Sequence, residues 1–165
     1  ALPIGIDEST AELQPLLATA GSRLLVEIVD RMAIGPVPEE AQDEHLVTYA
    51  ARIERREGTC DWNRPAVDVH NHIRGLQPWP LVSVFLHARR LLLVQSQVAS
   101  PDIPQSVAPG TVVRADADWL VVAANPGSVR LLSVQPEGRA PMRVRDFLNG
   151  HRVAVGDRLA PDGSS

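Results

Sequence analysis

Apolar positions in the first 34 residues repeat with the period of an α-helix. Ser9, Thr10, Ala11 and Glu12 form the pattern of a capping box, so we expect a helix to begin near Thr10. Beyond this point, apolar residues recur every three or four positions, at Leu13, Leu16, Leu17, Ala20, Leu24, Ile28 and Met32. This period predicts a helix that buries one face. Gly21 is a candidate break into two helices, and Gly35-Pro36 ends the pattern.

Beyond Pro80 the pattern changes to that of β-strands. Short runs rich in Val and Leu, separated by turn residues, predict strands at 81–87, 91–98, 110–114, 119–123 and 129–135. Five short strands at this spacing predict a small closed barrel. A helix is predicted from Pro65 to Arg74, with Gly75 as a left-handed cap. Residues 143–149 indicate one or two further helical turns, stopped by Gly150.

The segment between these parts is charged. Residues 39–44 are acidic and are expected to form an exposed linker. Arg52, Arg55 and Arg56 follow at spacings that would bring them together on a helix. We therefore predict an α+β chain with helices in residues 1–46, a basic linker in 47–62 and a barrel domain in 63–165.

The overall composition is that of a globular chain, but its charge is unevenly distributed. The 165 residues suit one ordinary domain or two small ones. Residues 1–46 carry nine acids and two arginines, a net charge of −7, whereas the remainder carries fourteen arginines and eleven acids, a net charge of +3. This asymmetry favours a polyanionic partner for the second part only. All sixteen basic residues are arginines, which fits either a GC-rich genome or a need for bidentate phosphate contacts.

Few residues suggest catalysis or metal binding. His70 and His72 lie two positions apart on a predicted helix, so they point in different directions, and we expect one to be packed and the other solvated. Asp116 and Asp118 flank a predicted turn. Cys60 is the only cysteine, so no intramolecular disulfide can form, and neighbouring acids should raise its pKa and make it inert. The arginines remain the candidate functional surface, with ordinary surface solvation as the alternative.

Ordered motifs along nearly the whole chain resemble one family. They are Thr48-Tyr49-Ala50, Ile53-Glu54, Asp61-Trp62, His70-Asn71 with Ile73-Arg74-Gly75-Leu76, Pro78-Trp79-Pro80, Pro109-Gly110-Thr111-Val112, Gln135-Pro136-Glu137-Gly138 with Met142 and Asp146-Phe147-Leu148, and Gly156-Asp157-Arg158-Leu159. Together they resemble the C-terminal portion of methionyl-tRNA formyltransferases. Gln77 replaces the family's usual Asn, and Ala51 stands where a lysine is common.

The resemblance implies specific roles for the three parts. Residues 1–46 would be the terminal helices of a Rossmann-type catalytic domain, and 63–165 an OB-like antiparallel barrel that, with the linker, binds initiator methionyl-tRNA. The tRNA-binding residues would be Arg52, Arg55, Arg56 and Arg74. No catalytic residue and no metal ligand is carried over, because the family's Asn, His and Asp motif would precede Ala1.

The same resemblance implies the setting of the activity. The intact enzyme would take its formyl group from 10-formyltetrahydrofolate, whereas this chain alone would bind no cofactor and lack catalysis. No apolar run is long enough to span a bilayer and no export signal is visible, so we expect a monomeric, cytoplasmic protein without a membrane partner. The alternatives are the C-terminal part of a sugar-nucleotide formyltransferase or of a formyltetrahydrofolate hydrolase, or a purely structural barrel.

Overall fold

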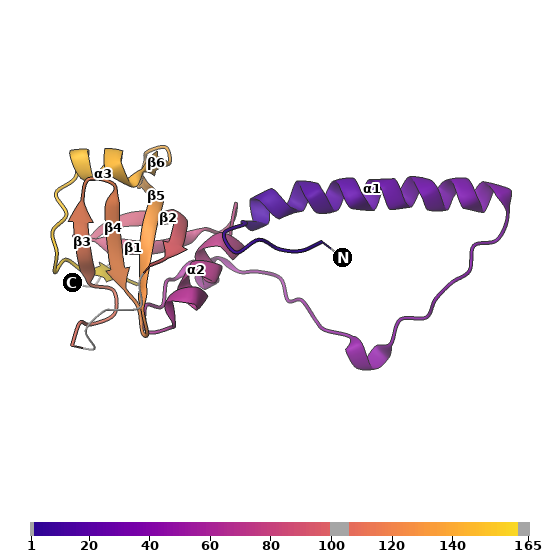
Figure 1. The fold of residues 1–165 in the computed structure, drawn as a ribbon, viewed down its shortest axis with the longest axis horizontal. Coiled ribbons are helices and arrows are strands. Elements are labelled where there is room, and N and C mark those ends of the chain that lie inside the picture. The colour runs from indigo at the N-terminus through magenta and orange to yellow at the C-terminus, as the bar shows by residue number, and fades with distance from the viewer. Residues whose placement is uncertain (1, 100–105, 162–165) are drawn as a thin grey trace.

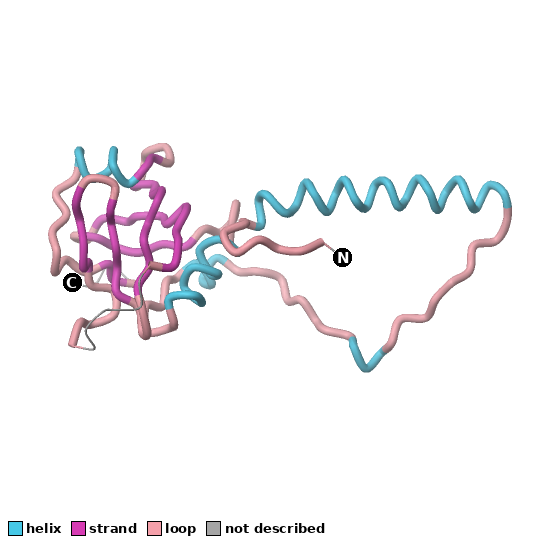
Figure 2. Tube along the Cα trace, viewed as in Figure 1, coloured by secondary structure: helices cyan, strands magenta, loops and turns pink. Residues whose placement is uncertain are grey.

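The computed structural model describes residues 2–99 and 106–161, and it consists of a small β-barrel from which one long helix extends (Figures 1 and 2). Helix α1 covers Thr10–Ile34. The predicted capping box is confirmed, because the Ser9 hydroxyl accepts from the Glu12 amide and the Glu12 carboxylate accepts from the Ser9 amide at 2.8 Å. Gly21 does not interrupt the helix.

The expectation that α1 buries one face is wrong for the described chain. None of its residues is buried. The large apolar side chains that remain exposed on it are Leu16, Leu17, Leu24, Leu25, Val26, Val29, Met32 and Ile34. The reason is spatial, since α1 points away from the barrel and no other described element runs along it (Figure 1).

A long linker leads from the end of α1 back to the barrel. It contains two short 3-10 helices, η1 at Glu44–Leu46 and η2 at Arg55–Gly58, and residues 39–44 are exposed as predicted. The linker joins the barrel at η2, where Gly58 is buried and Thr59 forms a parallel bridge to Ser83. Because residues 47–54 are not helical, the linker arginines are not arranged on an α-helix.

Helix α2, Ala66–Gly75, packs its buried side chains Ala66, Val69, His70 and Ile73 toward the sheet. Its bounds agree with the predicted helix to within one residue. The predicted glycine cap is wrong, since Gly75 is the last helical residue, has no positive φ, and is followed by Leu76 as the cap. Turns follow at residues 76–80, and the left-handed residue is Leu81, which has φ +64° and donates its amide to the Leu76 carbonyl at 3.0 Å.

The strands form one antiparallel sheet. They are β1 Val82–Leu86, β2 Arg89–Val98, β3 Val112–Asp116, β4 Trp119–Ala123, β5 Ser128–Pro136, β6 Met142–Arg143 and β7 Leu159–Ala160. The order across the sheet is β3-β4-β5-β2-β1-β7, with β6 paired to β5. Five of these strands were predicted, with boundary errors of two residues or fewer, whereas the two-residue strands β6 and β7 were not. Helix α3, Val144–Gly150, confirms the late helical turns.

The sheet curls until its two ends meet. The Leu159 amide donates to the Gly110 carbonyl and the Val112 amide donates to the Asp157 carbonyl, both at 2.8 Å. Gly110 has φ +85°, and a Cβ there would lie 3.0 Å from the Trp62 ring and 3.1 Å from the Leu159 carbonyl, so this closure depends on glycine. The partly closed barrel encloses a core of fully buried side chains that includes Val84, Leu93, Leu120 and Leu131.

Candidate nucleic-acid interface

One end of the barrel carries a hollow of about 730 Å³ with an apolar floor and a basic rim. The floor consists of Leu86, Leu91, Pro136 and Phe147. The remaining lining residues are His87, Arg89, Arg90, Glu137, Arg139, Gly150, His151 and Arg152. We call this hollow the basic pocket. Its rim has four arginines against one carboxylate.

The rim comes from three chain segments that the sheet brings together. The first is the tight turn between β1 and β2, where Leu86 pairs with Arg89 and both intervening residues have positive φ, +49° at His87 and +59° at Ala88. This backbone matches the right-handed twist of the two strands. The turn thereby places Arg89 and Arg90 at the start of β2, on the pocket rim.

The other two segments are the turn after β5 and the end of α3. After β5, Gly138 has φ +70°, and the Arg139 amide donates to the Pro136 carbonyl at 3.0 Å. At the end of α3, the His151 ring stacks on Phe147 with ring centroids 4.4 Å apart. Neither contact involves a guanidinium group of the rim.

The carboxylate of Asp157 lies beside the pocket and is held there by several contacts. The Ala154 amide donates to the Asp157 carboxylate at 2.8 Å, and this bond is the largest cause of the lowered pKa of Asp157. His87 lies 3.1 Å from the same carboxylate, and the charge of Arg152 lowers the pKa further. The carboxylate of Asp157 is thus held by the Ala154 amide and by two residues that line the pocket, His87 and Arg152.

Some arginines of the barrel form ion pairs or ring contacts within the protein, and others do not. Arg64, Arg114 and Arg145 form ion pairs with Asp68, Asp116 and Asp118. Arg130 lies 3.6 Å over the Trp119 ring and donates to the Asp118 carbonyl.

In contrast, the side chains of Arg89, Arg90 and Arg139 have neither an ion pair nor a hydrogen bond with any other described residue. They are available to an external anion, and guanidinium groups match the geometry of phosphate oxygens.

The four arginines predicted to bind tRNA do not form one cluster. Arg52 and Arg55 are exposed on the linker without a partner in the described part of the chain. Arg56 is also exposed but pairs with Glu54 at 2.8 Å. Arg74 lies at the junction between α1 and the barrel, where its Nη1 donates to the Gly5 and Glu8 carbonyls at 3.3 and 2.7 Å.

The linker arginines and the basic pocket lie toward opposite ends of β1. Thr59, just after η2, bridges to Ser83 near the start of that strand, and His87 follows its last residue. His87 lies four residue steps of extended chain beyond Ser83, which corresponds to roughly 13 Å.

Sequence reasoning missed the basic pocket. Arg89 and Arg90 lie between two predicted strands, Arg139 follows a turn glycine, and Arg152 follows Gly150. The available signal was that each of these arginines lies in or beside a turn. The pairing of β2 with β5, in which Leu91 is opposite Pro136, brings these turns together. This pairing joins residues far apart in the chain, so no short stretch of sequence indicates it.

The other candidates have structural roles. His70 is 1% exposed, and His72 is half-buried with its Nε2 2.7 Å from the Glu57 carbonyl. The pKa of the Cys60 thiol is raised to about 12 as predicted, but the main cause is burial, and the neighbouring acid Asp61 contributes less. Within the described residues, no group of three or more His, Cys, Asp or Glu side chains is placed to hold a metal.

Asp116 ends β3 and Asp118 lies in the turn before β4, as predicted. No helix within residues 2–99 and 106–161 has both the length and the apolar character needed to cross a membrane.

The described chain is thus a curled antiparallel barrel domain with an arginine-rimmed pocket at one end. The chain belongs to the formyl transferase family, since residues 52–152 match the family model "Formyl transferase, C-terminal domain". This confirms the resemblance found in the motifs.

Its curated relatives include methionyl-tRNA formyltransferases from Citrifermentans bemidjiense, 35% identical over 99% of this chain and 50% of that protein, and Bacillus subtilis, 35% identical over 92% and 48%. The chain spans about half the length of these relatives.

Solved structures show the same fold. A variant of HypX from Aquifex aeolicus superimposes with a TM-score of 0.67 at 14% identity, covering 89% of this chain and 27% of HypX. HypX in complex with tetrahydrofolic acid superimposes with a TM-score of 0.58, also at 14% identity, over 80% of this chain and 25% of that protein. At such low identity the likeness concerns the fold alone.

Proposed function

We propose that this chain is the tRNA-binding C-terminal part of a methionyl-tRNA formyltransferase, and that the basic pocket and the linker arginines bind backbone phosphates of initiator methionyl-tRNA. The observation that carries this proposal is the group of arginines around the pocket that lack partners within the described protein. In this proposal residues 63–165 are an OB-like barrel domain, residues 47–62 are the basic linker, and the protein is monomeric and cytoplasmic.

The chemistry of the pocket suits an RNA backbone. Phosphate contacts provide most of the affinity of such interfaces, and each contact displaces bound counterions. Arg89, Arg90 and Arg139 can each present two parallel N–H donors to one phosphate. Arg52 and Arg55 would extend the path beyond the pocket. Arg56 can join them after exchanging its exposed pairing with Glu54, because such pairs contribute little stability.

The proposal also covers the catalytic unit that this chain would serve. Residues 1–46 would be the terminal helices of the catalytic domain, and the exposed apolar side chains of α1 would pack on the rest of that domain. The whole enzyme would transfer a formyl group from 10-formyltetrahydrofolate to the amino group of methionyl-tRNA. No residue of this chain has a proposed catalytic role, so the chain alone should not catalyse transfer.

A salt-dependent titration of the purified chain with initiator methionyl-tRNA tests the binding proposal. Two double variants remove charge from the proposed path, R89Q/R139Q at the pocket and R55Q/R56Q in the linker. The matched control is R23Q/R31Q, which removes two exposed arginines from α1.

Each phosphate contact contributes about 0.7–0.9 to the slope of log affinity against log salt, so a fourfold rise in salt costs about threefold in affinity per contact. Each path variant should flatten the slope by about 1.4–1.8, and the control should leave it unchanged.

Two results would refute the proposal. One is the absence of measurable tRNA binding at low salt. This result is expected if the barrel is purely structural, or if the intact protein acts on a substrate without tRNA. The other is an equal slope for R89Q/R139Q and R23Q/R31Q. An elongator methionyl-tRNA run in parallel tests selectivity for the initiator. Formylation of methionyl-tRNA above background by this chain would contradict the absence of catalysis.

A further inference from the structure

The extended segment that precedes α1 is bound by its backbone to the barrel. Arg74 donates through Nη1 to the carbonyls of Gly5 and Glu8, and Nε2 of His70 lies 3.0 Å from the carbonyl of Ile6. Two side chains of α2 thus contact three carbonyls within four residues. We propose that these contacts form a clamp that fixes the direction in which α1 leaves the barrel, and that Arg74 is a positioning residue and not a phosphate ligand.

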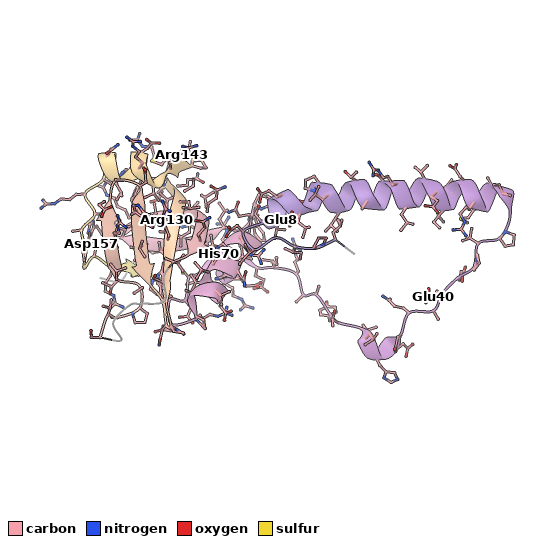
Figure 3. All side chains as sticks on the ribbon, viewed as in Figure 1. Glu8, Glu40, His70, Arg130, Arg143 and Asp157 are labelled. Atoms are coloured by element: carbon pink, nitrogen blue, oxygen red, sulfur yellow. The ribbon has the colours of Figure 1, made fainter. Side chains whose placement is uncertain are left out.

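His70 forms the buried centre of this clamp. Its side chain is 2% exposed, with Nδ1 3.0 Å from the Ser96 hydroxyl on β2 and Nε2 3.3 Å from the Asp7 carboxylate. A buried polar group is costly to leave without partners, so a side chain with partners on both sides favours a single arrangement. His70 therefore couples the sheet to the segment before α1 (Figure 3).

Further bonds hold the segment from two sides. The Thr10 hydroxyl donates to the Gly75 carbonyl at 2.7 Å, and the Gln97 amide on β2 lies 3.4 Å from the Asp7 carboxylate. The Arg74 guanidinium is itself held by the Asn71 side chain, with Nε donating at 2.8 Å. The start of α1 is therefore fixed to both α2 and β2.

The linker cannot fix α1 in place of the clamp. The 25 residues of α1 give a helix about 37 Å long, which is attached to the barrel at its first turn. The linker residues 35–54 can span roughly 66 Å when fully extended, so they leave the far end of α1 free to move. Since α1 has no buried residue, the described contacts that set its direction are those of the clamp.

The clamp determines where anything carried by α1 lies relative to the basic pocket. A change of about 20° at the clamp would displace the far end of α1 by about 13 Å. The capping box at Ser9 and Glu12 joins the clamped segment directly to the first turn of α1. The orientation of the clamped segment therefore sets the direction of the helix, with no flexible residue between them. This positioning role does not depend on whether the pocket binds tRNA.

Distance measurements between spin labels on the full chain test the clamp. Exposed Met32 near the end of α1 and exposed Val155 on the barrel are replaced by cysteine and labelled, whereas buried Cys60 stays unlabelled. We expect one narrow distance distribution in the parent chain. Arg74→Ala should at least double its width, Arg74→Lys should give an intermediate width because one donor group remains, and Arg23→Ala on α1 should leave it unchanged.

Additional measurements separate positioning from folding and from tRNA binding. Thr10→Val removes the hydrogen bond to the Gly75 carbonyl, and Asp7→Asn removes the carboxylate charge that faces His70. Neither change touches the core, so both should also broaden the distribution and leave the melting temperature of the barrel unchanged. They test the clamp even where Arg74→Ala does not fold.

A distribution that stays narrow in Thr10→Val, Asp7→Asn and every folded Arg74 variant would overturn the proposal. So would a loss of about one unit of tRNA salt slope in Arg74→Ala, as a phosphate ligand predicts.

Discussion

Gly58 offers a direct test of how the linker is joined to the barrel. A Cβ at this position would lie 2.4 Å from the Leu81 carbonyl oxygen, a distance at which the backbone must move. Leu81 cannot readily yield, since it has φ +64° and its amide is bound to the Leu76 carbonyl. Gly58→Ala should therefore force η2 away from β1 and weaken the bridge between Thr59 and Ser83.

The size of the effect follows from two opposing contributions. Inserting a methyl group against fixed atoms typically costs about 1–3 kcal/mol. Alanine offsets about 0.4–1 kcal/mol of this by restricting the unfolded chain. The expected net loss is about 1–2 kcal/mol, which lowers the melting temperature of a barrel of this size by about 5–10 °C.

Thermal denaturation followed by tryptophan fluorescence measures this loss, because Trp62 is buried next to the linker junction. Gly75→Ala is the matched control. Gly75 ends α2 and has no neighbour within 4 Å of an added Cβ, so alanine there should stabilise by up to about 1 kcal/mol. If both variants melt at or above the temperature of the parent chain, the tight contact between η2 and Leu81 is refuted.

Three further outcomes are expected. Cys60, with a pKa raised to about 12 mainly by burial, should resist a thiol reagent at pH 8 until urea unfolds the chain, and labelling of the folded chain at the rate of a free thiol would contradict its burial. Folding lowers the pKa of Asp157, so the stability that this carboxylate contributes is present above its unfolded pKa and is lost as the pH falls through its folded pKa. Asp157→Asn should therefore lower the urea midpoint of unfolding more at pH 7 than at pH 3. An equal decrease of the midpoint at both pH values would exclude this linkage. Ser9→Ala removes the α1 cap and should reduce helical circular dichroism without shifting the melting temperature of the barrel, whereas a parallel shift would show that α1 and the barrel unfold together.

Local signals in the sequence were sufficient to predict the main elements. The capping box fixed the start of α1, and runs of Val and Leu located five strands because each run ends at a turn residue. The short elements η2, β6 and β7 were missed, since two to four residues carry no periodic signal. The period of α1 correctly indicated an apolar face, but a period cannot indicate whether another element covers that face.

The candidate site was harder to predict because it depends on contacts between distant residues. The linker arginines could be found as a cluster in the sequence, whereas the pocket combines Arg89, Arg139 and Arg152 from three turns. The role of Arg74 was also not evident from its charge. Its donors face carbonyls of Gly5 and Glu8, more than sixty positions earlier, and only the fold brings these groups together.

The net charge of −4 taken alone disfavours an anionic partner, but the location of the charges removes this objection. Four carboxylates of the linker and barrel already pair with arginines, at Glu54, Asp68, Asp116 and Asp118. The acidic surplus of −7 belongs to residues 1–46, and more than half of it comes from four linker residues, Glu39, Glu40, Asp43 and Glu44, whereas α1 contributes only −1. Figure 3 shows Glu40 on the part of the linker that lies away from the barrel.

Exposed charges farther apart than about 8–10 Å are largely screened at physiological salt, so that surplus has little effect at the pocket. The local field is set by the unpaired arginines of the rim, and it is positive. The clamp contributes no phosphate contact of its own, so releasing it by Arg74→Ala should leave the salt slope of tRNA binding unchanged, whereas removal of the rim arginines should flatten it.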